Sequence, residues 1–279
     1  HASLTLRDLL ESGHSTQPAL LIPESEARVS YGALHNQVEQ LAATLQSLGI
    51  GRDDRVAMAL PNGLEVITTF FAITAAAATA APLNSAYTTD EFRFYLEDIG
   101  AKALIVPPGG GEHARAAVPA GAMILEASAT QDGRVQLEVI RAANFARKQT
   151  EPTADDVALF LHTSGTTSRP KGVPLSHLNL LTSADNVATT YALTPEDVSL
   201  CVMPLFHVHG LVASTFATLR TGGAIVVPSR FSASAFWPMV KTHRATWYTA
   251  VPTIHQVLLA RAEEDQAPAP GTSDLRLIR

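Results

Sequence analysis

The chain has 279 residues, of which 46% are hydrophobic, and its net charge is −6. This length and composition predict a sizeable core and two subdomains, while the negative charge makes nucleic acid and anionic membrane surfaces poor general partners. With a single cysteine, Cys201, the chain cannot form an internal disulfide, and it suits a reducing compartment such as the cytoplasm.

Helix and strand signals alternate along the first half of the chain. A helix is predicted from Tyr31 to about Leu48, and Thr88 with Glu91 forms a capping-box pattern for a helix that ends near Gly100. Strands are expected at 55–60 and 103–106, shorter ones at 123–125 and 135–140, and a connector at 141–154.

An uncharged run extends from Val66 to Ala81. It contains four threonines and stops at Pro82, whereas a membrane span needs about 20 apolar residues. The run therefore predicts a buried, alanine-rich helix and no integral membrane span.

The alternation of elements continues in the second half. Strands are expected at 157–160, 198–203, 224–227, 245–249 and 275–279, and helices at 178–191, 211–219, 232–242 and 252–264. The whole pattern predicts an α/β fold with two helix-flanked, mostly parallel sheets. We expect a first subdomain over residues 1–150 and a second over residues 151–279.

A polar loop is predicted from Leu161 to Gly172, after a buried strand, where open α/β sheets place their ligand sites. Its glycines allow backbone N–H groups to converge on an anion, its hydroxyls can donate to phosphate, and Arg169 can add a second cation. The candidate phosphate-binding residues are Thr163, Ser164, Gly165, Thr166, Thr167 and Lys171. The spacing is not that of a Walker A loop, and the alternative interpretation is a solvated Ser/Thr/Gly loop.

A second unusual loop, from Pro204 to Gly210, contains His207 and His209. Two histidines in this spacing can form a metal pair, but no Cys/His cluster accompanies them, so no metal site is predicted. A structural role for each histidine is the alternative to a functional one.

The run from Thr163 to Gly172 resembles the phosphate-loop signature of the adenylate-forming enzymes, which include acyl-CoA synthetases, luciferases and peptide-synthetase adenylation domains. Segments similar to other family motifs follow the same order along the chain, at 51–57, 61–62, 82–84, 204–211 and 245–254. Ser168 and Arg169 depart from the usual pattern, and together with the segments 207–209, 230–233, 236–237 and 246–256 they look like the oxalate–CoA ligase branch.

The resemblance implies an AMP-forming reaction. A carboxylate attacks the α-phosphate of ATP, pyrophosphate leaves, and the thiol of coenzyme A then displaces AMP from the acyl-adenylate. It implies that Lys171 neutralises phosphate charge with catalytic effect, that Mg²⁺ accompanies ATP, and that His207 lies at the acyl-site wall beside the reacting carboxylate. His209 is a second candidate for binding the acid, and a polar wall favours a small acid such as oxalate.

Further parts of the family's site have no counterpart among these residues. The resemblance places the adenine, ribose and Mg²⁺ contacts and the small C-terminal domain beyond Arg279. We therefore expect an N-terminal fragment with little or no adenylation activity by itself. The alternatives are another branch of the superfamily, such as a fatty-acid or hydroxycinnamate CoA ligase or an adenylation domain, and a truncated, non-catalytic nucleotide-binding module. The oligomeric state does not follow from the sequence.

Overall fold

The computed structural model describes residues 4–163, 169–269 and 271–279. The chain divides into two compact units. The first unit contains Leu34–Leu181 with the N-terminal residues up to Asp8, and the second contains Leu9–Ala33 and Thr182–Arg279. Each unit is built on one mixed sheet with helices, so the predicted α/β class is confirmed.

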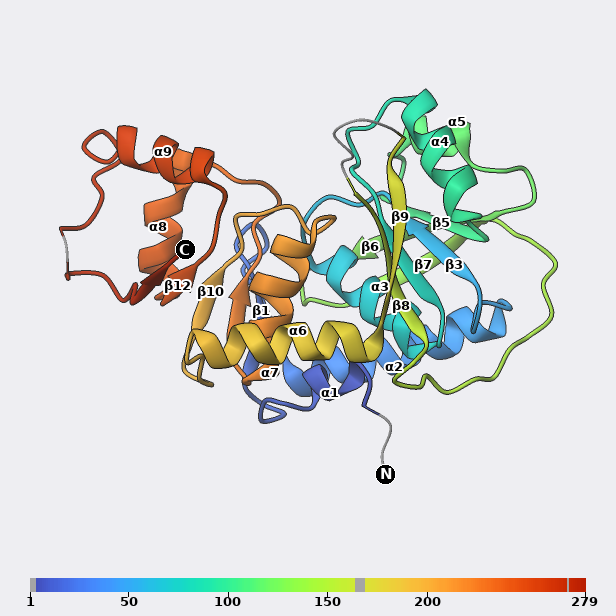
Figure 1. Ribbon diagram of the computed structural model, residues 1–279, viewed down its shortest axis with the longest axis horizontal. Helices are drawn as coiled ribbons and strands as arrows, with labels where there is room; N and C mark the ends of the chain where they lie inside the picture. The colour runs from blue at the N-terminus through green and yellow to red at the C-terminus, as the bar shows by residue number, and fades with distance from the viewer. Residues whose placement is uncertain (1–3, 164–168, 270) are drawn as a thin grey trace. The chain divides into compact units, whose positions relative to one another are not determined.

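The sheet of the first unit has seven strands among the described residues, in the order β7-β6-β5-β3-β4-β8-β9. Its five inner strands are parallel, while the two edge strands, β7 and β9, are antiparallel to their neighbours (Figure 1). The strands are β3 (Arg55–Met58), β4 (Thr79–Pro82), β5 (Ala103–Val106), β6 (Met123–Ala129), β7 (Val135–Arg141), β8 (Val157–Thr163) and β9 (Lys171–Ser176).

The sheet of the second unit has six strands among the described residues, in the order β13-β12-β10-β11-β1-β2. All pairs are parallel except β1 with β2, a hairpin that the sequence patterns did not predict. The strands are β1 (Pro18–Ile22), β2 (Ala27–Ser30), β10 (Val198–Leu200), β11 (Ala224–Val226), β12 (Trp247–Tyr248) and β13 (Leu277–Ile278).

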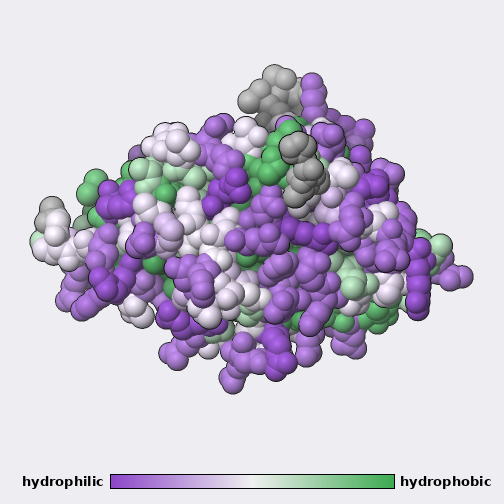
Figure 2. All heavy atoms as spheres, turned by 90° about the horizontal axis from the view of Figure 1, so that it is seen from below, coloured by the Kyte–Doolittle hydropathy of each residue, from purple (hydrophilic) through white to green (hydrophobic). Residues whose placement is uncertain are grey.

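The described helices connect and cover these strands. They are α1 (Arg7–Leu10), α2 (Tyr31–Ser47), α3 (Leu64–Ala75), α4 (Thr89–Ile99), α5 (Glu112–Ala117), α6 (His177–Thr190), the π-helix η1 (His209–Phe216), α7 (Ala217–Arg220), α8 (Ala233–His243) and α9 (Pro252–Ala260). None of the helices in the described ranges is long and apolar enough to cross a membrane. Figure 2 views a face on which hydrophilic residues predominate and hydrophobic areas are small.

Helix α4 follows directly from its sequence. Thr88 Oγ1 accepts the N–H of Glu91, and the Glu91 carboxylate accepts the N–H of Thr88, which confirms the predicted capping box. Gly100 ends the helix with φ 64°, in the left-handed region that glycine enters without steric cost. Three side chains at helical spacing, Phe92, Leu96 and Ile99, attach α4 to the core of the first unit.

The uncharged run at 66–81 is buried as predicted, but it is not one helix. Helix α3 ends at Ala75, Ala77 takes a left-handed conformation, and Thr79–Pro82 forms the inner strand β4. The prediction was wrong here because small side chains suit a strand that is buried on both faces as well as they suit a packed helix.

The predicted loop at 161–172 is also shorter than expected. Strand β8 continues to Thr163, and β9 begins at Lys171, opposite Thr163. The pattern concealed β9 because Gly172 and Pro174 are poor strand formers, and an edge strand tolerates both. This hairpin joins the first sheet through β4, and the first unit extends to Leu181. The division into domains at residue 150 stays a prediction.

Candidate functional site

The end of the β8–β9 hairpin carries the described part of the predicted phosphate site. Thr163 and Lys171 face each other in the ladder, both are exposed, and Thr163 Oγ1 lies 3.5 Å from the Lys171 carbonyl oxygen. Within the described part of the chain, the Lys171 ammonium makes no hydrogen bond or ion pair. Ser164, Gly165, Thr166 and Thr167 lie outside the described residues.

Gly172 has a different role from the one predicted. It does not turn the backbone; it lies in β9 opposite His162. A Cβ atom at this position would lie 2.2 Å from Cζ of Phe160, so the aromatic ring occupies the space of a side chain. Glycine is therefore required by close packing beneath the hairpin.

The two predicted histidines belong to the second unit. His207 is exposed and its ring contacts that of Phe206, with centroids 4.6 Å apart. His209 begins η1, and its Nε2 lies 2.6 Å from Oγ1 of the buried Thr249. Regions of π-helix are frequent at functional sites, because the wider turn displaces side chains from their usual positions.

Burial lowers the pKa of both His207 and His209, and for His209 the nearby His207 and His255 lower it further. Both imidazoles are therefore neutral at pH 7. A neutral ring offers one N–H donor and one acceptor, which suits hydrogen bonding to a carboxylate without a fixed positive charge.

A third histidine, His255, joins this region and was not among the predicted site residues. Its Nε2 lies 3.2 Å from the carbonyl oxygen of Ala250, which can only accept, so Nε2 carries the proton. In the neutral ring Nδ1 is then an acceptor for the hydroxyl of Tyr248, 3.1 Å away. The available signal was its place in the segment 246–256, which carried the narrower family likeness. No group of three metal-ligating side chains is found in the ranges that the structure describes.

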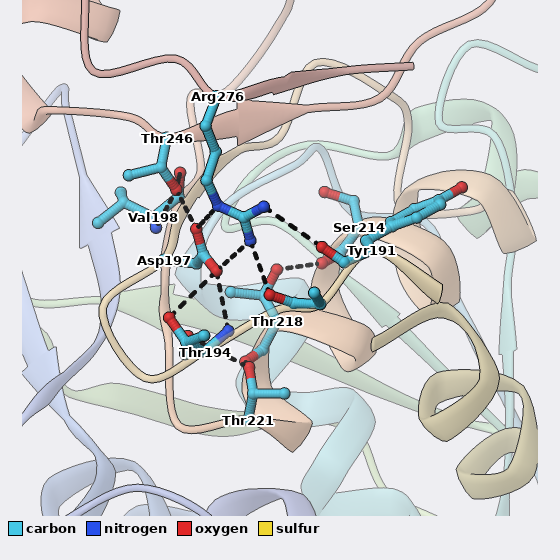
Figure 3. Close-up of polar contacts among 10 residues, drawn as sticks. Tyr191, Thr194, Asp197, Val198, Ser214, Thr218, Thr221, Thr246 and Arg276 are labelled. Atoms are coloured by element: carbon cyan, nitrogen blue, oxygen red, sulfur yellow. Dashed lines mark hydrogen bonds and ion pairs between the residues drawn. The ribbon is translucent and has the colours of Figure 1, made fainter. Parts of the chain in front are cut away.

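The strand that leads to the histidine loop, β10, is attached to its surroundings by the buried carboxylate of Asp197 (Figure 3). Arg276 donates to both carboxylate oxygens, at 2.8 and 2.5 Å, Thr246 donates at 2.6 Å, and the N–H of Thr194 donates at 2.8 Å. Burial alone would raise the pKa of Asp197, but these hydrogen bonds outweigh it and hold the pKa below its usual range.

Arg276 also extends to the end of α6, where it donates to the carbonyl oxygens of Tyr191 and Ala192 (Figure 3). A cation at this position satisfies carbonyl groups that have no partner within a helix. One arginine thus connects β13, the start of β10 and the end of α6 inside the second unit.

Two curated relatives are similar to this chain over most of its length. The oxalate–CoA ligase of Arabidopsis thaliana is 43% identical, covering 99% of this chain and 55% of that protein. The oxalate–CoA ligase of Saccharomyces cerevisiae is 37% identical, covering 91% of this chain and 52% of that protein. The chain thus spans about half the length of the curated relatives it matches.

A solved structure has the same fold. The crystal structure of ATP-bound MatB from Rhodopseudomonas palustris superposes with a TM-score of 0.77 at 26% identity, covering 99% of this chain and 54% of that one. The model of the AMP-binding enzyme family matches residues 12–278, which is nearly the whole chain, and the chain therefore belongs to the AMP-binding enzyme family.

Proposed function

We propose that the chain is the N-terminal part of an ATP-dependent, AMP-forming acid–thiol ligase whose acid is oxalate or a similarly small, polar carboxylic acid. The observation that supports it best is the exposed Lys171 at the end of the β8–β9 hairpin, whose ammonium makes no hydrogen bond or ion pair to a residue that the structure describes, in a chain 43% identical to an oxalate–CoA ligase. The single cysteine, Cys201, is free and buried, which favours the reducing cytoplasm as the location of the protein.

In the proposed reaction a carboxylate oxygen of the acid forms a bond to the α-phosphorus of ATP, and pyrophosphate departs. The thiol of coenzyme A then bonds to the acyl carbon, loses its proton, and AMP departs. Lys171 neutralises charge on the leaving pyrophosphate, and Thr163 with the hydroxyls of Ser164, Thr166 and Thr167 orients the phosphates. Mg²⁺ accompanies ATP as a further source of positive charge.

The acid is proposed to bind at the histidine region of the second unit. His207 is exposed and contacts the reacting carboxylate, while His209 binds or supports it through its bond to Thr249. Neutral imidazole donors suit a small dianionic acid better than they suit a fatty chain, which offers no acceptor for their N–H groups.

Nucleotide titration tests the phosphate site. The Lys171→Ala variant is expected to raise the Kd for ATP with Mg²⁺ by about tenfold or more, because a hydrogen bond to a charged group contributes about 1.5–3 kcal/mol. Lys241→Ala, which removes an exposed lysine of α8, is the matched control and is expected to bind like the wild type. Equal Kd values for both variants would contradict the proposed role of Lys171.

A substrate panel tests the acid. In the ligase of full length, oxalate is expected to give faster acyl-CoA formation than fatty or hydroxycinnamic acids, and His207→Ala is expected to remove most oxalate turnover. Preference for an aromatic or long-chain acid would assign the chain to another branch of the family. ATP binding with no turnover of any acid at full length would favour a non-catalytic nucleotide-binding module.

A further inference from the structure

Helix α4 presents a cluster of aromatic rings at the loop end of the β8–β9 hairpin. Tyr95 is stacked on Tyr87, with centroids 4.7 Å apart, and meets the ring of His162 edge to face at 4.8 Å. Phe160 meets His162 from the β8 side, at 5.3 Å. The His162 side chain is only 6% exposed. The β8 end of the loop, which we call its first root, is therefore embedded between a helix and a strand.

The same helix holds this root by a polar contact. His162 Nε2 lies 2.7 Å from a carboxylate oxygen of Asp98, in the last turn of α4. The carboxylate accepts, so Nε2–H is the donor. Hydrogen bonds to a charged group are about twice as strong as neutral ones, and this one has its donor side buried.

The β9 end of the loop, which we call its second root, contacts α4 as well. The guanidinium carbon of Arg169 lies 4.6 Å from the ring centroid of Phe94, one turn before Asp98 on the helix. A planar cation over an aromatic face is attracted by the negative charge of the ring surface. Arg169 is one of the two residues at which this chain departs from the usual family pattern.

We propose that Phe94 and Asp98 form an anchor on α4 that holds both roots of the phosphate loop, and that Arg169 is a positioning residue and not a phosphate ligand. The inference rests on the proposed function of the loop, but its contacts are independent of any nucleotide. Holding both roots reduces the conformational freedom that Thr163 and Lys171 lose when they bind phosphates, so the anchor raises nucleotide affinity.

The sequence of α4 allows this arrangement. Its buried face attaches the helix to the core, while Phe94 and Asp98, four residues apart, lie on one neighbouring face. Phe94 is half-buried and Asp98 is exposed, and neither contributes to the core cluster. Their contacts with Arg169 and His162 therefore account for residue types that helix packing does not require.

Hydrogen exchange without nucleotide tests the anchor directly. Amides at the hairpin end, at residues 162–163 and 171–172, are expected to exchange about two- to fivefold faster in Phe94→Leu and about tenfold faster in Asp98→Ala. Phe94→Tyr keeps the ring and is expected to restore the wild-type rate. Glu97→Ala, an exposed acidic residue beside Asp98, is the matched control. Unchanged exchange in both anchor variants would overturn the anchor, whether or not the chain binds ATP.

Titration with ATP and Mg²⁺ then tests the role of Arg169. As a positioning residue, Arg169→Ala should raise the Kd by the same two- to fivefold as Phe94→Leu, and the double variant should be no weaker than either single one. A loss of tenfold or more in Arg169→Ala alone would identify a phosphate ligand and overturn the proposal, as would tighter binding in either variant. Failure of the wild type to bind ATP would instead contradict the proposed function and leave the exchange result to decide the anchor.

Discussion

His177, at the start of α6, couples the stability of the first unit to pH. Its Nδ1 accepts the N–H of Leu6 at 3.0 Å, so the neutral ring carries its proton on Nε2, which is buried without a partner among the described residues. Burial lowers the pKa of His177 to about 4, from an unfolded value of 6.5. The folded state thus binds its proton only at lower pH, and the stability it contributes is complete above pH 6.5 and lost as the pH falls to about 4.

We expect the free energy of unfolding to decrease by about 3 kcal/mol between pH 7 and pH 4 on account of His177. His177→Asn keeps an acceptor for the N–H of Leu6 but does not titrate, so its stability curve should be flatter by that amount. Urea denaturation across this pH range measures the difference. His113→Asn, at an exposed histidine of α5, is the control, and parallel curves for wild type and His177→Asn would disprove the assignment.

Asp197 makes a second prediction at the residue scale. Its side chain is 3% exposed and accepts five hydrogen bonds, so Asp197→Asn should destabilise the second unit by about 2–3 kcal/mol. Asp185 pairs with Arg220 on the surface, and the Asp185 side chain is 49% exposed. Asp185→Asn should therefore lower the free energy of unfolding by less than about 1 kcal/mol. Chemical denaturation compares the two variants; equal losses would mean that the buried pair contributes no more than the exposed one.

At the scale of elements, the β8–β9 hairpin depends on the fit between Gly172 and Phe160. A methyl group at residue 172 would overlap the Phe160 ring, and overpacking of this kind costs about 1–3 kcal/mol. Gly172→Ala should therefore destabilise the first unit and displace Lys171, with a corresponding loss of ATP affinity.

The shorter side chain of Phe160→Leu should make room for the added methyl group. The double variant Gly172→Ala/Phe160→Leu is then expected to lose less unfolding free energy than the two single variants lose together. Chemical denaturation of the three variants and the wild type measures the difference. If the losses of unfolding free energy were additive, the side chains at positions 160 and 172 would not compete for the same space.

At the scale of the molecule, the chain spans about half the length of its curated relatives, and this makes a prediction about activity. The 279-residue chain alone is expected to release little or no pyrophosphate from ATP with oxalate, because the proposed roles of Lys171 and His207 cover only phosphate and acid contacts. A coupled pyrophosphate assay checks this, with the full-length ligase as the positive control. Release by the chain at a comparable rate would refute the prediction.

Sequence alone was sufficient wherever the determinants are local. Thr88, Glu91 and Gly100 set both ends of α4, and the capping box formed as predicted. The order of motifs identified the family that the comparison confirms, while the phosphate-binding role of the polar run at 163–172 stays a prediction. These signals lie within a few residues of each other, so one sequence displays them completely.

Tertiary structure decided the contacts between distant residues. Residues 79–82 became a strand because β3 and β8 lie on either side of it, and β9 formed because β8 offered an edge. The pairs His209–Thr249, Asp197–Arg276 and Phe94–Arg169 join residues 40 to 79 positions apart. No periodicity or spacing encodes such partners, since the packing of sheets and helices alone brings them within bonding distance.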